Sequence, residues 1–403
     1  MLKKNTLGAH NSRILFWVQF FASASFLQPV ITLFYMQNGL TEKEIFWLIM
    51  CWSGAVLLSE VPTGIYADKF GPKISFMTGA LVKILSLALL LGADIPALLF
   101  LSSFLSGCSV TFFSGADEAL LYESLKKSGD ENKMDRVMGR ISSATFITSL
   151  VTVFVGAFLA KDLTEGQFEL LIYLGMVAFL FVFILSAFII EPKVEISYRE
   201  NAFSHVKEGF HVIKKTPELF LMFMNLTLVF IPAAAVFQNF DQPLLLNAGI
   251  SVVGIGIVYS IAAIIGFFAT HRLDWLLDRI SGLKLFFITG LAAGVSLLII
   301  SQLGDKSLVV ILCFLVLRFV SAIRYPIYSQ IQNDLIPSHV RATTISLLSV
   351  LDSICDLIIF GSLSGIAVFG LSPIFMVCGI IAILASFIPI RKAKESIKNN
   401  LAV

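Results

Sequence analysis

The ten residues GIYADKFGPK, from Gly64 to Lys73, form a short polar loop between two long apolar segments. The first segment covers residues 44–67 and overlaps the start of this stretch, and the second segment covers residues 74–93. Each has at least the ~20 residues that an α-helix needs to cross a bilayer core about 30 Å thick. The loop is therefore predicted to join two membrane-spanning helices.

Outward from this loop, similar apolar segments recur along all 403 residues, and a polar stretch at 191–217 divides them into six and six. Only 14% of the residues are charged and 57% are hydrophobic, whereas a soluble chain carries about 25% charged residues. Lipid leaves helices or closed barrels as spanning structures. We predict an all-α polytopic membrane protein, with twelve transmembrane helices in two pseudo-symmetric six-helix bundles at 1–190 and 218–403. The predicted spans are 14–36, 44–67, 74–93, 96–125, 137–160, 168–190, 218–246, 252–275, 284–303, 307–331, 342–369 and 373–390.

The distribution of positive charge orients these spans. Of the 29 Lys and Arg residues, 23 fall in the termini, in loops on the same side or at the span ends next to those loops, 3 fall in loops on the other side, and 3 lie deeper within spans. Because Lys and Arg collect in cytoplasmic loops, both termini are predicted to be cytoplasmic, in the inner membrane. The formal net charge of +2 argues against a nucleic-acid partner. The expected partners are the lipid bilayer and a small-molecule substrate, and the chain is expected to act as a monomer.

The polar stretch at 191–217 has its own pattern. Phe203, Val206, Phe210 and Ile213 recur at helical spacing with charged residues between them. This pattern predicts an amphipathic helix on the inner membrane face, which serves as a tether between the bundles or as a regulatory or partner-binding segment.

Cofactor chemistry is not indicated by the sequence. The five Cys residues lie far apart in apolar segments without C-x-x-C spacing, so neither a disulfide framework nor a zinc site is predicted. The five His residues lie outside the spans or at their edges, and the chain has no phosphate-binding G-x-x-x-x-G-K-[ST] motif. We therefore expect no enzyme activity, no metal and no cofactor, with a proton gradient as the energy source.

Charged residues in the middle of two spans predict a functional site, because each costs at least about 2.5–3.5 kcal/mol there. Arg318 and Arg324 lie in the span at 307–331, about 120° apart on a helix, so that one is expected to pair sideways. Asp352 and Asp356, four residues apart in the next span, share one helix face. The leading hypothesis is a buried relay in which protonation of a carboxylate releases an arginine for an anionic substrate or shifts the access equilibrium. The alternative is a static set of ion pairs that fixes helix register.

Polar residues in three other spans extend this hypothesis. Gln28 lies in the first span, while Gln238 and Asp241 lie toward the outer end of the span at 218–246, where they suit substrate contact or an outer gate. Lys83 in the third span is expected to snorkel toward the interface or to pair with an acidic residue.

The loop from Gly64 to Lys73 also resembles the G-x-x-x-D-x-x-G-x-[RK]-[RK] signature of the major facilitator superfamily, although Pro72 stands where that family often has Arg. Together with the twelve spans, the resemblance covers essentially the whole chain. Gly64 is expected to allow close helix packing, Gly71 to form a tight turn and Lys73 to add an inside charge. By resemblance, Asp68 accepts hydrogen bonds from the helix that begins near residue 341, which latches the cytoplasmic side.

A second group of residues near the cytoplasmic side resembles a bacterial subgroup of drug and metabolite transporters. It combines Glu60-Val-Pro-Thr with an acidic cluster at the end of the fourth span, opposite a loop that contains two arginines. Three interpretations stay open, namely an ion-paired gate, a proton site at Asp117 or Glu118, and a solvated helix end. The residues concerned are Glu60, Asp117, Glu118, Glu123, Arg136 and Arg140.

These observations predict a secondary active transporter that moves a small organic solute by alternating access, coupled to protons. The subgroup resemblance favours efflux, whereas the arginines within spans favour an importer of an organic anion or chelate as the alternative. Multidrug antiporters of the family typically carry an Arg in the middle of the fourth span and a G-P-x-x-G-G run in the fifth, and this chain has neither. A membrane sensor without transport activity is a more remote alternative.

Overall fold

The structure is a computed structural model that describes residues 6–130, 133–192, 213–214, 216–336 and 341–389. All regular elements in these residues are helical. The chain divides into two compact units, one formed by residues 1–196 with 251–260 and the other by the remainder. Each unit is described in turn. The amphipathic helix predicted in the polar stretch lies almost entirely outside the described residues.

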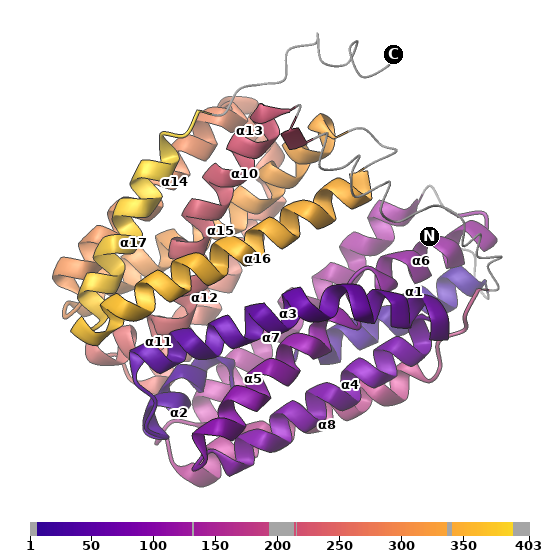
Figure 1. Cartoon of the computed structure of the whole chain (residues 1–403), viewed down its shortest axis with the longest axis horizontal. Coiled ribbons are helices and arrows are strands. Elements are labelled where there is room, and N and C mark those ends of the chain that lie inside the picture. The colour runs from indigo at the N-terminus through magenta and orange to yellow at the C-terminus, as the bar shows by residue number, and fades with distance from the viewer. Residues whose placement is uncertain (1–5, 131–132, 193–212, 215, 337–340, 390–403) are drawn as a thin grey trace. The chain divides into compact units, whose positions relative to one another are not determined.

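In the N-terminal unit, local sequence signals set the helix boundaries (Figure 1). Thr41 begins α3 with a capping box, in which its side chain and that of Glu44 satisfy each other's backbone N–H groups. Pro72 and Pro96 open the following helices, where the missing proline N–H is not needed. The helices are α1 (Leu7–Ala22), α2 (Ile31–Gln37), α3 (Glu42–Phe70), α4 (Pro72–Leu89), α5 (Pro96–Thr111), α6 (Ala116–Lys127), α7 (Met134–Leu159) and α8 (Glu165–Ser186).

In the C-terminal unit, α14 and α17 pack closely through small residues. Gly294 faces Gly379, and a Cβ added to Gly294 would lie 2.9 Å from the Gly379 carbonyl oxygen. The short π-helix η4 (Ile231–Val236) joins α10 directly to α11. The helices after α8 are α10 (Pro217–Phe230), α11 (Phe237–Asn247), α12 (Val252–His271), α13 (Leu273–Arg279), α14 (Gly282–Leu303), α15 (Ser307–Leu335), α16 (Arg341–Ile366) and α17 (Leu371–Ser386), with the first part of α12 belonging to the other unit.

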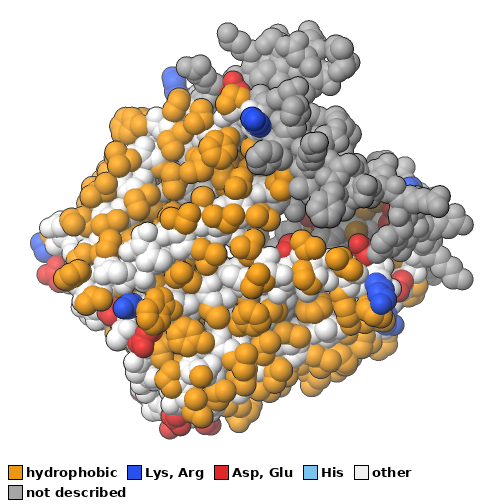
Figure 2. Space-filling model, in the orientation of Figure 1, with side chains coloured by type: hydrophobic (Ala, Val, Ile, Leu, Met, Phe, Trp, Pro, Cys, Tyr) orange, Lys and Arg blue, Asp and Glu red, His pale blue; other side chains and the backbone are white. Residues whose placement is uncertain are grey.

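The predicted twelve spans are confirmed as helical segments. Ten segments of the described residues are long and apolar enough to cross a membrane, and α17 is a shorter apolar helix. The twelfth is the first predicted span, which α1 and α2 form together. The surface agrees with a lipid environment, because hydrophobic side chains cover much of the face in Figure 2, and α8 exposes Tyr173, Val177 and Phe181.

Three spans that were predicted as continuous helices are interrupted well inside their predicted bounds. The first begins at Leu7, is non-helical at residues 23–27, and resumes with a 3₁₀ turn (η1, Gln28–Val30) that contains a proline. The fourth breaks between α5 and α6, where Gly115 adopts a φ of +71°. The seventh widens into the π-helix η4 next to Pro232. Glycine conformations and missing proline donors account for these breaks, which apolar periodicity alone does not reveal.

Candidate functional site

A buried ion pair connects α11 and α15 in the C-terminal unit. Arg318 Nη2 donates to Asp241 Oδ2 at 2.8 Å, and the Asp241 side chain is fully buried whereas that of Arg318 is 20% exposed. The guanidinium of Arg318 also lies 5.0 Å from the centre of the Phe314 ring. Arg318 is thus partly accessible to solvent, whereas its partner Asp241 is not.

Arg324 lies two turns further along α15 and is buried differently, with only 2% of the residue exposed. Its Nη2 donates to Asn225 Oδ1 at 2.7 Å and its Nη1 to the Phe286 carbonyl oxygen at 2.5 Å. The guanidinium also stacks on the Phe286 ring, 3.8 Å from its centre. Gly290 leaves room for it, because a Cβ there would lie 3.0 Å from Arg324 Nη1.

The predicted pairing of Arg324 with Asp352 or Asp356 is wrong in this structure. Among the described residues, the hydrogen-bond acceptors of Arg324 are neutral groups on α10 and α14. The predicted angle between Arg318 and Arg324 gives the reason, since a side chain about 120° away from Arg318 points between neighbouring helices. Arg324 is therefore the arginine that pairs sideways.

Asp352 and Asp356 are half-buried on α16. The Thr227 hydroxyl of α10 donates to Asp352 Oδ1 at 2.6 Å. Thr227 and Asn225 were not predicted as site residues, although both are polar positions in the largely apolar first half of the span at 218–246. A single turn of α10 thus contacts both the predicted arginine, through Asn225, and the predicted aspartate, through Thr227.

The other residues assigned to the relay divide between the two units. Gln238 is half-buried on the first turn of α11, three residues before Asp241. Gln28 is half-buried at the start of η1, in the N-terminal unit. The structure therefore groups Asp241, Gln238 and the α15 arginines in one unit and leaves Gln28 in the other.

The loop between α3 and α4 forms the predicted tight turn, with Gly71 at a φ of +87°. Lys73 contributes its backbone N–H, which donates to Glu191 Oε1 at 3.0 Å, so the Glu191 carboxylate lies at the positive N-terminal end of α4. Asp68 is exposed on the last turn of α3. The close helix approach expected at Gly64 is not found, because no described atom of the N-terminal unit lies within 4 Å of an added Cβ.

The acidic cluster at the end of the fourth span does not form the predicted ion pairs. Within the described residues, neither Arg136 nor Arg140 forms an ion pair with this cluster, and Arg140 instead lies over the Phe16 ring. The break at Gly115 starts a new helix, which places Asp117 in its first turn. Asp117 Oδ1 accepts the Glu118 N–H at 2.8 Å, Glu60 Oε1 accepts the Ser114 hydroxyl at 2.8 Å, Glu118 is exposed and Glu123 is half-buried.

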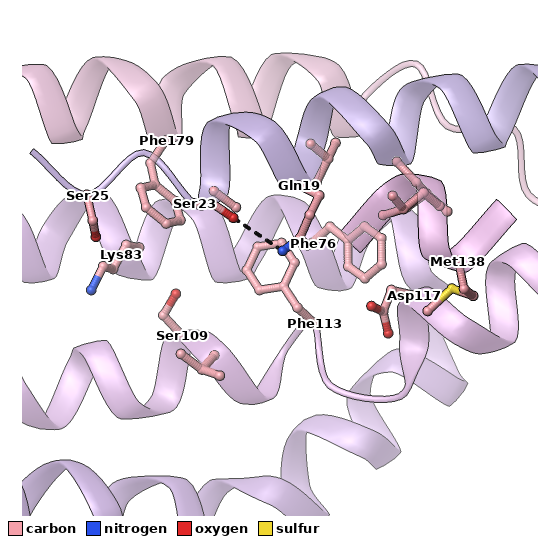
Figure 3. A pocket seen from close by; sticks show the side chains of 15 residues that line it. Gln19, Ser23, Ser25, Phe76, Lys83, Ser109, Phe113, Asp117, Met138 and Phe179 are labelled. Carbon is pink, nitrogen blue, oxygen red and sulfur yellow. Dashed lines mark hydrogen bonds between the residues drawn. The ribbon is translucent and has the colours of Figure 1, made fainter. Parts of the chain in front are cut away.

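The N-terminal unit contains a partly open cavity of about 350 Å³ that α1, α4, α5, α6, α7 and α8 line (Figure 3). Its wall includes Lys83 and Asp117. Lys83 Nζ donates to Ser106 Oγ at 2.5 Å, so this lysine has a hydroxyl partner rather than the expected acidic one. No group of three His, Cys, Asp or Glu side chains suited to a metal ion occurs in the described residues.

The helical membrane fold, the buried charges within spans and the cavity with a few polar groups on its wall define a polytopic membrane transporter. A sequence profile of the Major Facilitator Superfamily matches residues 15–359, and the chain belongs to this family. Its members are transporters and not enzymes.

Individual relatives agree with this assignment. The chain is 24% identical to the MFS-type transporter YxaM of Bacillus subtilis (strain 168) over 363 residues, which cover 86% of this chain and 87% of YxaM. It is 33% identical over 146 residues to the multidrug resistance protein MdtH of Baumannia cicadellinicola subsp. Homalodisca coagulata, covering 36% of this chain and 33% of MdtH. The fold is similar to that of the nucleoside transporter NupG, with a TM-score of 0.72, 15% identity, and coverage of 94% of this chain and 97% of NupG.

Proposed function

We propose that this protein is a proton-coupled secondary active transporter that moves a small organic solute by alternating access. The observation that carries the proposal is the ion pair between Asp241 and Arg318. A fully buried carboxylate depends on its cationic partner to remain charged. Protonation of Asp241 would therefore weaken the contact between α11 and α15 and release the more exposed Arg318. This release would shift the equilibrium between the access states and so couple proton binding to transport.

Asp352 and Asp356 form the second part of the proposed relay. Asp352 is half-buried and accepts a hydrogen bond from Thr227. A protonated carboxyl can donate as well as accept, so protonation would allow Asp352 to change its hydrogen-bond partners between α10 and α16. This exchange supplies a way for a proton to shift the equilibrium between the two access states.

Export from the cytoplasm is the favoured direction. The support is the likeness to MdtH, whose name describes multidrug resistance, over 146 residues. The distribution of Lys and Arg supports an inner-membrane location with both termini in the cytoplasm. On this orientation the loop from Gly64 to Lys73 and the acidic start of α6 lie on the cytoplasmic side, where Asp68 and the Asp117 cluster contribute to a gate.

Import of an organic anion is the second candidate. The partial exposure of Arg318 favours it, because a guanidinium can bind a carboxylate or phosphate with two parallel hydrogen bonds. In this case the solute would compete directly with Asp241 for Arg318. The two candidates share the same residues and differ in the direction of net flux.

Transport assays in proteoliposomes test the proposal. A panel of drugs, metabolites and organic anions is screened with and without an imposed pH gradient, and the best solute is then followed in Asp241→Asn and in Asp352→Asn/Asp356→Asn. We expect the gradient to accelerate flux in the wild-type protein and to have no effect in Asp241→Asn, because the neutral amide cannot exchange a proton. Asp94→Asn, which changes an exposed carboxylate, is the matched control. Equal flux with and without the gradient in the wild-type protein would refute proton coupling.

A further inference from the structure

The cavity of the N-terminal unit has charges of opposite sign at its two ends. Figure 3 shows Lys83 at one end and Asp117 at the other, with Phe113 and Phe76 between them. At about 350 Å³, the cavity falls within the range of about 300–1,000 Å³ that small-molecule sites occupy. An apolar middle with polar groups at defined positions is the usual composition of such sites.

Lys83 has donors available for an anionic group. Its ammonium carries three N–H donors, and Ser106 is its hydrogen-bond partner among the described residues. No carboxylate in the described part of the chain forms an ion pair with it. A cation within a membrane span is costly unless it is paired or contacts a polar cavity. An anion bound in the cavity would provide a negatively charged partner for Lys83.

Asp117 provides the complementary end. One of its oxygens accepts the Glu118 N–H, as expected for a carboxylate in the first turn of α6. The carboxylate has further acceptor positions for a cationic group. Asp117 is half-buried, as is Lys83, so both charges are partly removed from water and each interacts more strongly with a ligand than an exposed charge does.

Rings and hydroxyl groups line the part of the cavity between these ends. Phe179 adds a third ring to the wall, and Ser23 and Ser25 lie at the break after α1. Ser25 and Ser109 lie close to the lysine end in Figure 3. The interrupted first span therefore brings polar side chains to an otherwise apolar wall, which suits a flat apolar or aromatic body with polar substituents.

We infer that this cavity binds an amphoteric organic solute, whose anionic group pairs with Lys83 and whose cationic group pairs with Asp117 across an apolar or aromatic body. A zwitterion pairs with both Lys83 and Asp117 and leaves the cavity without net charge. A simple anion pairs only with Lys83, and a simple cation pairs only with Asp117. The inference rests on the proposed function, because it names the class of solute that the transporter recognises. It places this recognition in the N-terminal unit, while Asp241 and Arg318 couple it to protons.

Equilibrium binding tests the inference without any gradient. Calorimetry on the full chain in nanodiscs compares two zwitterions, 4-(aminomethyl)benzoate and 4′-(aminomethyl)biphenyl-4-carboxylate, with biphenyl-4-carboxylate and 4-biphenylmethylamine. We expect a zwitterion to bind at least about tenfold more tightly than the anion or the amine alone, as one additional charge-assisted hydrogen bond predicts. Lys83→Met and Asp117→Asn should each remove this advantage, and Lys83→Arg should retain most of it. Lys161→Met and Asp94→Asn, at exposed positions, serve as matched controls.

The outcomes separate this inference from the proposed function. Failure of both zwitterions to bind, or unchanged binding in Lys83→Met, would overturn the inference even if a pH gradient drives flux. Charge-dependent binding that persists in Asp241→Asn would support it, and flux without any gradient dependence would then refute only the proton coupling. If Lys83→Met loses binding, Lys83→Arg must restore it, because loss in both variants would indicate a structural role and overturn the inference.

Discussion

The surroundings of a cation within a span differ between the two units. In the C-terminal unit, Arg324 is enclosed by Asn225, by the Phe286 ring and carbonyl, and by the space that Gly290 leaves. In the N-terminal unit, Lys83 has one hydroxyl partner among the described residues and borders a cavity. Both residues lie within helices long and apolar enough to span a membrane, so sequence position alone does not distinguish them.

The difference teaches that the surroundings of a charge within a span indicate its role. A cation with several protein acceptors has a fixed position, and its removal exposes those acceptors. A cation on a cavity wall can instead bind a solute that replaces water. Arg318 is intermediate, since it pairs with Asp241 but keeps 20% of its side chain exposed. We therefore propose a structural role for Arg324 and functional roles for Lys83 and Arg318.

The largest expected effect on stability comes from Arg324→Ala. The truncation strands the Asn225 side-chain oxygen and opens a void between α10, α14 and α15, so we expect a loss of about 3 kcal/mol or more in the free energy of unfolding. Unfolding in detergent micelles, followed by circular dichroism, measures it. Arg279→Ala removes an exposed arginine that stacks on Trp275 and should cost about 1 kcal/mol or less. Equal stability of the two variants would contradict the structural role of Arg324.

Gly290→Ala is expected to lower the free energy of unfolding by less than Arg324→Ala does. The added methyl group would collide with the Ser386 hydroxyl and would lie 3.0 Å from Arg324 Nη1, and such overpacking typically costs about 1–3 kcal/mol. The same unfolding experiment measures the change. Gly54→Ala is the matched control, because no described atom lies within 4 Å of its added Cβ and alanine favours a helix. An increase in the free energy of unfolding of Gly290→Ala would show that the Arg324 guanidinium is not closely enclosed.

The smallest expected effect is that of Lys83→Ala, the same truncation in the other unit. The vacated space joins an existing cavity, and among the described residues only the Ser106 hydroxyl loses a partner. We expect the free energy of unfolding to change by about 1 kcal/mol or less, while binding of a charged solute is lost. Comparison of the melting temperatures of Lys83→Ala and Arg324→Ala is decisive, since a loss at Lys83 as large as that at Arg324 would remove the distinction between the units.

The number and extent of the spans could be predicted from the sequence. Runs of about 20 apolar residues report directly on bilayer thickness, and the turn at Gly71 follows from the loop that joins two of them. The interruptions after Ala22 and at Gly115 were not predicted. The breaks at residues 23–27 and 112–115 are each only about one helical turn long. They hardly change the mean hydropathy, so the apolar pattern continues across them.

The partners of the charged residues could be predicted only in part. The positions of Arg318, Arg324, Asp241 and Asp352 within spans marked them as functional or structural sites. Their pairing was predicted between adjacent spans in the sequence, whereas Arg318 reaches α11 and Arg324 reaches α10 and α14. Spacing along one helix gives the angle between two side chains but does not identify the helix that each one meets.

The sequence by itself determined that this is a helical membrane protein of the major facilitator family, because hydropathy and the loop from Gly64 to Lys73 are local properties of the chain. Only the tertiary structure decided that neutral groups surround Arg324, that Asp241 forms an ion pair with Arg318, and that Lys83 borders a cavity. The physical reason is that the energy of a charge in a membrane protein depends on the acceptors, rings and space around it. Helices distant in the sequence supply these surroundings.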